Sequence, residues 1–171
     1  TRFDNVTGVQ TCALPILPSM TNKITVQTAA ELIELGEKLG ALLGGGEVIE
    51  LAGDIGAGKT TFTKGVARGM KITDDVQSPT FTISRNYYAP GSLRLAHYDF
   101  YRLRDAGIMK MELDEAMHDP GIVTVIEWSD IVSDVLPADA LRIAIAVQPD
   151  DSRLVTFEGD GKTRRLIKEL A

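Results

Sequence analysis

The chain has 171 residues, of which 44% are hydrophobic and 25% charged, and this balance excludes a disordered, collagen-like or coiled-coil chain. No apolar run approaches the roughly 20 residues that span a bilayer, so we expect no membrane anchor and no membrane partner. The formal net charge is −6, and phosphate contacts need Lys and Arg, so any role with nucleic acid should be local or pass through a partner. The single cysteine, Cys12, excludes an internal disulfide framework and a cysteine-based zinc site.

The first nineteen residues differ in character from the rest of the chain. Pro15 and Pro18 interrupt any helical or strand period, and no basic segment precedes an apolar core as in a signal peptide. Met20 then opens a segment typical of a normal start. We therefore expect residues 1–19 to be a non-native or disordered extension and residues 20–171 to form one domain. That domain has no cysteine, which fits a reducing cytoplasm.

Hydrophobic spacing and turn residues predict a mixed series of elements. A strand over 23–27 precedes a helix that Thr28 caps, since T-A-A-E has the spacing of a capping box with Glu31. The helix should bury Leu32, Leu35, Leu39 and Leu42 and end at the glycines 44–46. Further strands are predicted over 47–52, 81–88, 93–100, 122–126, 141–147 and 154–158, and helical segments over 61–70, 103–118 and 162–170. The apolar run 122–126 is expected to be a central strand.

Residues 53–60 read GDIGAGKT and match the phosphate-binding pattern G-x-x-x-x-G-K-[ST]. Glycines let consecutive backbone N–H groups surround a phosphate, and the following helix adds its positive end. Lys59 would bring its charge to the β- and γ-phosphates, and the Thr60 hydroxyl would bind Mg²⁺. The motif and the element order predict an α/β fold. We expect a single P-loop NTPase domain, with a central, mostly parallel sheet flanked by helices and antiparallel edge strands.

Such an enzyme also needs a carboxylate near the metal, at the end of a buried strand. Glu127 follows the apolar run 122–126, and Asp99 ends another predicted strand. Spacing leaves open which of the two binds Mg²⁺ and which orients water. Thr80 lies where nucleotide-sensing loops occur, and Trp128 fills either the core edge or the nucleotide site. We expect structural or surface roles for His97 and His118.

The motifs GDIGAGKT, SPTF, HYDFYRL and IEW occur in this order and together resemble the bacterial TsaE (YjeE) family, from Met20 to about Val147. These are small ATPases required for the threonylcarbamoyladenosine (t6A) modification of tRNA next to the anticodon. The resemblance implies ATP and Mg²⁺ as cofactors, with hydrolysis that is weak alone. It also implies that the TsaD–TsaB heterodimer is the partner and that tRNA is met indirectly, through that complex.

The resemblance further implies roles for single residues. The nucleotide-binding positions would be Gly53, Ile55, Gly56, Ala57, Gly58, Lys59, Thr60, Thr61 and Trp128. The metal would lie among Thr60, Glu127 and Asp99, and the catalytic set would be Lys59, Asp99, Glu127 and Thr80. Residues 27–30 would lie against the adenine.

Other classes of P-loop protein fit less well. A small-molecule kinase is the main alternative, but the arginines after the P-loop are scattered rather than grouped as in a lid. A GTPase needs D-x-x-G and N/T-K-x-D, and neither occurs after Thr60. A binding module without turnover would not need Asp99 and Glu127.

Overall fold

The computed structural model describes residues 19–171, so Cys12 and nearly all of the expected N-terminal extension lie outside the described residues. Among the described residues, no helix is both long and apolar enough to cross a membrane.

One seven-stranded sheet, in the order β1-β7-β6-β2-β5-β4-β3, organises the fold. The strands are β1 (Met20–Val26), β2 (Val48–Ala52), β3 (Ser84–Tyr88), β4 (Arg94–Asp99), β5 (Ile122–Glu127), β6 (Leu141–Val147) and β7 (Arg153–Gly159). The four adjacent strands β6, β2, β5 and β4 run parallel, whereas β7 pairs antiparallel with β6, β1 with β7 and β3 with β4. The predicted fold class, a mostly parallel sheet with antiparallel edges, is confirmed.

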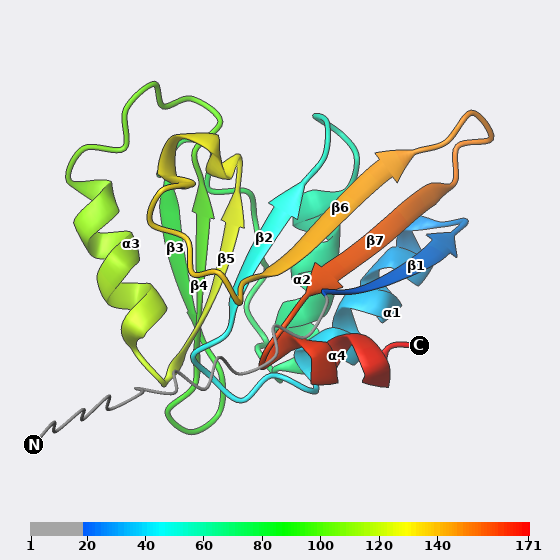
Figure 1. Cartoon of the computed structure of the whole chain (residues 1–171), viewed down its shortest axis with the longest axis horizontal. Coiled ribbons are helices and arrows are strands. Elements are labelled where there is room, and N and C mark those ends of the chain that lie inside the picture. The colour runs from blue at the N-terminus through cyan, green and yellow to red at the C-terminus, as the bar shows by residue number, and fades with distance from the viewer. Residues whose placement is uncertain (1–18) are drawn as a thin grey trace, which may run out of the picture.

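Helices cover both faces of this sheet (Figure 1). The helices α1 (Ala29–Gly40), α2 (Lys59–Gly69) and α4 (Thr163–Glu169) share one apolar cluster with inward side chains such as Ile143 and Val125. The helix α3 (Met109–His118) and the 3₁₀ turn η1 (Ser129–Val132) cover the other face, around Tyr98 and Ile126. The strand β5 is buried at every residue, as expected for a central strand.

The predicted start of α1 is confirmed, and its predicted end is displaced. The Thr28 hydroxyl accepts a hydrogen bond from Glu31 N at 3.1 Å, and the Glu31 carboxylate accepts one from Gln27 N at 2.8 Å. The regular helix ends at Gly40 rather than at the glycines 44–46. Leu42 N and Leu43 N donate to carbonyls three residues back, so the last turn tightens before those glycines.

Four glycines bring α1 and α2 into backbone contact. A Cβ at Gly36 would lie 2.4 Å from Phe62 O, and one at Gly65 would lie 2.1 Å from Ile33 O. Gly40 and Gly69 are equally close to the opposite helix, since their Cβ atoms would come within 2.2 Å of its carbonyl oxygens. Because α2 begins at Lys59, within the phosphate-binding motif, this contact helps to fix the position of that motif at the edge of the sheet.

Several predicted boundaries are wrong. Residues 81–83 do not belong to β3, because Thr82 N and Ile83 N both donate to Pro79 O and close a turn. Phe81 is 82% exposed in consequence. The helix α3 begins at Met109 rather than at residue 103, and η1 was not predicted. The helix α2 begins at Lys59, two residues before the predicted start, since Phe62 N already donates to Gly58 O.

Candidate nucleotide-binding site

The GDIGAGKT loop joins β2 to α2 at the edge where the parallel strands end (Figure 1). Gly53 has φ +145° and Gly58 has φ +115°, a region that other residues rarely adopt. A Cβ would also lie 2.5 Å from Ile145 O at Gly53 and 2.6 Å from Leu32 Cδ2 at Gly58. The loop path therefore requires glycine at both positions. It places the N-terminal turn of α2, with its unpaired N–H groups and positive dipole end, beside the loop.

Lys59 lies inside this loop and is only 6% exposed. Its ammonium donates to the carbonyl oxygens of Gly53, at 2.7 Å, and of Asp54, at 3.0 Å. The same nitrogen lies 4.5 Å from the centre of the Trp128 ring, close enough for a cation–π contact. The positive charge is thus held at the inner wall of the loop.

Asp99 and Glu127 end neighbouring parallel strands and are register partners across β4 and β5. Each residue is 3% exposed. Both were predicted as strand-end carboxylates, and the sheet brings them to the same edge as the loop.

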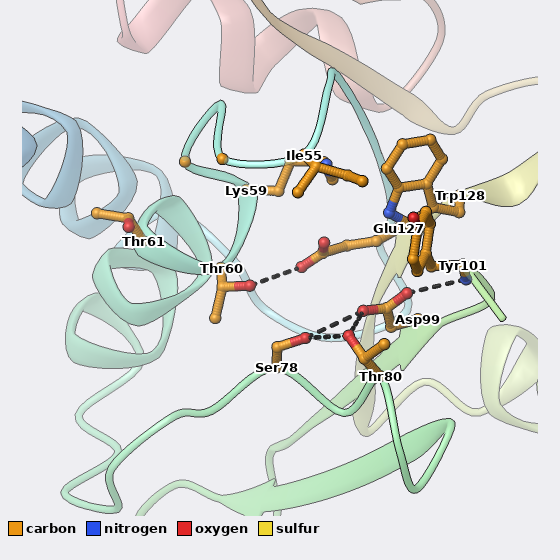
Figure 2. A pocket seen from close by; sticks show the side chains of 12 residues that line it. Ile55, Lys59, Thr60, Thr61, Ser78, Thr80, Asp99, Tyr101, Glu127 and Trp128 are labelled. Carbon is orange, nitrogen blue, oxygen red and sulfur yellow. Dashed lines mark hydrogen bonds between the residues drawn. The ribbon is translucent and has the colours of Figure 1, made fainter.

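Glu127 faces α2. Its Oε1 accepts a hydrogen bond from Thr60 Oγ1 at 3.3 Å and lies 2.9 Å from His97 Nε2 (Figure 2 shows the Thr60 contact). His97 is fully buried on β4, two residues before Asp99 and on the same face of the sheet. A structural role for His97 was expected from the sequence. Its contact with Glu127, a candidate site residue, was not predicted.

Asp99 instead holds the segment that precedes β3. Its Oδ2 accepts hydrogen bonds from the hydroxyls of Ser78, at 3.0 Å, and Thr80. Its Oδ1 accepts one from Tyr101 N at 3.0 Å. The two carboxylates thus have separate partners, one on the P-loop helix and one on the Thr80 segment. Ser78 belongs to the SPTF motif, but the sequence suggested no individual role for it.

Two aromatic rings form the wall opposite the loop. Trp128 follows Glu127 directly and has φ 58° and ψ 52°, a left-handed conformation that is uncommon for a residue with a side chain. The Tyr101 ring lies against it, with 5.0 Å between the ring centres. Of the two alternatives for Trp128, the structure places the side chain at the site rather than only at the core edge.

These residues surround a cavity of about 360 Å³. It is lined by Ile55, Gly56, Gly58, Lys59, Thr60, Thr61, Ser78, Thr80, Asp99, Tyr101, Glu127 and Trp128. Figure 2 shows Thr60 facing Glu127, with Thr61 turned away from it. Most of the residues proposed from the sequence therefore come together in one place.

Two of the proposed residues and one proposed segment do not line the cavity. Gly53 does not line the cavity but carries the carbonyl that accepts from Lys59. Ala57 is 1% exposed and packs in the core, and its N–H donates to Asp54 O at 3.1 Å. Residues 27–30 do not line the cavity, and their contact with an adenine stays a prediction.

The donor set fits Mg²⁺. Among residues 19–171, no three His, Cys, Asp or Glu side chains gather into a metal site of their own. A threonine hydroxyl and one or two carboxylates are nevertheless what Mg²⁺ uses when phosphate oxygens and water complete its shell. Thr60 and Glu127 supply such oxygens 3.3 Å apart.

The chain has clear relatives among known proteins. Residues 26–155 match the family described as Threonylcarbamoyl adenosine biosynthesis protein TsaE. The tRNA threonylcarbamoyladenosine biosynthesis protein TsaE of Bacillus subtilis (strain 168) is 44% identical over 124 residues, which cover 72% of this chain and 77% of that protein. The protein of the same name from Treponema pallidum (strain Nichols) is 37% identical over 131 residues, which cover 76% of this chain and 95% of that one.

A solved structure agrees with these matches. The crystal structure of Bacillus subtilis YdiB aligns with a TM-score of 0.76 and 36% identity, covering 90% of this chain and 96% of that one. The likeness therefore spans the sheet, its helices and the loop together, in a P-loop NTPase fold. Since the family match also extends over most of the described residues, this chain belongs to the TsaE family, as its four ordered motifs predicted.

Proposed function

We propose that this protein is a Mg²⁺-dependent ATPase of tRNA threonylcarbamoyladenosine biosynthesis, the process for which its relatives are named. One observation carries the proposal. A P-loop hydroxyl, Thr60, contacts a buried carboxylate at a strand end, Glu127, at 3.3 Å. Hydrolytic P-loop enzymes hold the metal of their nucleotide with this combination of groups.

The loop and Lys59 would bind the phosphates. Backbone N–H groups of residues 55–59 and of the N-terminal turn of α2 would supply neutral donors and a positive dipole end, except that of Ala57, which donates to Asp54 O at 3.1 Å. An ammonium has three N–H donors, and the carbonyls of Gly53 and Asp54 take two of those of Lys59. The third is left for a phosphate oxygen.

The two carboxylates would divide the remaining work. We assign Glu127, with Thr60, to the metal, because these two side chains already contact each other. When bound, Mg²⁺ would neutralise charge on the β- and γ-phosphates. We assign Asp99 to the orientation of water, together with the Thr80 hydroxyl that it holds at the cavity. The rings of Trp128 and Tyr101 would exclude bulk water from the cavity on the side opposite the loop.

Family membership supports a proposal for the partner and the compartment. We propose the TsaD–TsaB heterodimer as partner, with tRNA held by that complex, in the cytoplasm. A net charge of −6 supports contact with tRNA through a partner rather than directly.

The test is ATP hydrolysis by the full chain, alone and with a purified TsaD–TsaB pair, with GTP as the comparison nucleotide. We expect slow hydrolysis alone, a clear rise with the pair and little GTP turnover. A rate of ATP hydrolysis that is the same with and without the pair would overturn the proposal that TsaD–TsaB is the partner. Absence of ATP hydrolysis under both conditions would overturn the proposed function altogether.

A further inference from the structure

Trp128 is held in a conformation that its own backbone disfavours. With φ 58° and ψ 52° it lies in the left-handed region, where a non-glycine residue persists only if its surroundings hold it. The conformation matters to the site, because it sets the indole 4.5 Å from the Lys59 ammonium. The next residue along the chain, Ser129, shows what holds it.

Ser129 is anchored on the far face of the sheet. Its hydroxyl donates to Glu50 Oε1 at 2.5 Å, and Arg142 Nε donates to Glu50 Oε2 at 2.9 Å. Ser129 is 7% exposed and the Glu50 side chain 18%. A carboxylate with both oxygens bonded, one of them to an arginine, is a fixed acceptor rather than a mobile surface group.

The strand register places Ser129, Glu50 and Arg142 on the face of the sheet opposite to Glu127. Glu50 on β2 pairs with Arg142 on β6, while Leu51, the next residue of β2, pairs with Glu127 on β5. Side chains alternate along a strand, so Glu50 and Glu127 lie on opposite faces of the sheet. The chain crosses from one face of the sheet to the other at Trp128. Glu127 is held on the face of α2 by Thr60 and His97, and Ser129 is held on the opposite face by Glu50.

We propose that Ser129, Glu50 and Arg142 are positioning residues that hold Trp128 over Lys59 and so prepare the site for ATP. The inference rests on the proposed ATP-binding function of that site. None of the three lines the cavity, so their effect must pass through the Trp128 backbone. Loss of the anchor should loosen the indole and weaken ATP binding, while Glu127, held separately by His97, keeps its place.

The experiment uses the full chain and its single tryptophan, so all indole fluorescence reports on Trp128. Ser129→Ala removes the hydroxyl donor. Ser133→Ala is the matched control, because Ser133 follows the same 3₁₀ turn and donates only to Asp130 O on the exposed side. Ser129→Thr keeps a hydroxyl and should restore most of the wild-type behaviour. Fluorescence emission, quenching by acrylamide, ATP affinity and kcat are measured for each.

For Ser129→Ala we expect red-shifted emission, stronger quenching and an ATP Kd raised about fivefold, with kcat at saturating ATP within about twofold of wild type. Emission, quenching and ATP affinity all equal to wild type would overturn the inference. If Ser129→Ala does not fold, Ser129→Cys gives the same comparison, since a thiol of similar size is a weak donor. A wild-type chain that binds no ATP would overturn the proposed function instead, and the emission of the nucleotide-free variants would still decide the position of Trp128.

Discussion

His97 Nε2 lies 2.9 Å from Glu127 Oε1, and neither side chain is more than 4% exposed. The same carboxylate oxygen accepts a hydrogen bond from the Thr60 hydroxyl. His97 therefore contacts Glu127 from the neighbouring strand, and Thr60 contacts it from α2. His97 Nδ1 has no hydrogen-bond partner among the described residues, which makes the Glu127 contact the one polar bond of this buried ring there. The pair connects the core of the sheet with the candidate metal site.

The role of His97 can be tested by two substitutions. His97→Leu removes the donor and should lower the rate of ATP hydrolysis about tenfold, with ATP affinity within about twofold of wild type. His97→Gln places an amide donor near the Nε2 position and should recover part of the rate. Steady-state kcat and KM with Mg²⁺ give both values. Full activity of His97→Leu would show that Glu127 needs no support from this ring.

Lys59→Ala should abolish detectable nucleotide binding, with a loss of affinity of about a hundredfold or more, because it removes the charge at the inner wall of the loop. Lys64→Ala is the matched control, since Lys64 lies on the same helix and its ion pair with Asp75 is exposed. Calorimetric titration with ATP measures both. An unchanged affinity in Lys59→Ala would contradict the phosphate-binding role of the loop.

Glu127→Ala should lose hydrolysis more than binding, with kcat lowered about a hundredfold, because the loop and Lys59 remain to bind the phosphates. Asp99→Asn should also slow hydrolysis, but its Mg²⁺ dependence should stay that of wild type. Glu115→Gln, an exposed acid on α3, serves as control. If Asp99→Asn rather than Glu127→Ala shifts the Mg²⁺ requirement, the metal role belongs to Asp99.

The central part of the site could be predicted because it depends on strand ends. The carboxyl ends of parallel strands meet at one edge of a sheet, so acids that end apolar runs converge on the loop that follows another such strand. Glu127 and Asp99 follow this rule, and their register pairing brings them together beside Thr60. The loop could be predicted equally well, because GDIGAGKT matches a pattern in which the glycines, the lysine and the threonine each have a physical reason.

Other contacts depend on which strands become neighbours, and no local pattern states that. The bond between Ser129 and Glu50 exists only because β5 lies beside β2. His97 reaches Glu127 because β4 pairs with β5 in one particular register. At Phe81 a local pattern was present, but it predicted the wrong structure. Its aromatic ring and its neighbours favour a strand, yet the Pro79 carbonyl closes a turn and leaves the ring exposed.

The Tyr98 hydroxyl should make stability depend on pH in the alkaline range. Burial raises the pKa of Tyr98 well above its ordinary value of 10, and the nearby Glu112 carboxylate raises it further. Above pH 10 the unfolded chain releases this proton while the folded chain keeps it, so the free energy of unfolding falls as pH rises.

Between pH 9 and 11 the wild type should therefore lose about 1.4 kcal/mol more of its unfolding free energy than Tyr98→Phe, which has no proton to release. Urea unfolding followed by circular dichroism at both pH values measures the difference. Tyr88→Phe, at an exposed position, should behave as wild type. Parallel losses in wild type and Tyr98→Phe would contradict the assignment.

Gly65→Ala should destabilise the protein even though alanine is the better helix former. The helix propensity gained is about 1 kcal/mol, but the added Cβ would lie 2.1 Å from Ile33 O, a backbone atom that cannot rotate away. Overpacking typically costs about 1–3 kcal/mol, and a clash with a backbone atom should lie at the upper end of that range. The clash should therefore outweigh the gain and leave a net loss of about 2 kcal/mol.

Gly44→Ala is the matched control for this prediction, since a Cβ at Gly44 would meet nothing within 4 Å and the residue lies outside the helices. Its free energy of unfolding in urea should stay within about 0.5 kcal/mol of wild type. Because α2 carries Lys59 and Thr60 in its first turn, Gly65→Ala should also weaken ATP binding, whereas Gly44→Ala should not. A Gly65→Ala protein as stable as wild type would mean that separating α1 and α2 costs no more than the roughly 1 kcal/mol of helix propensity gained, and that their contact does not fix the position of the loop.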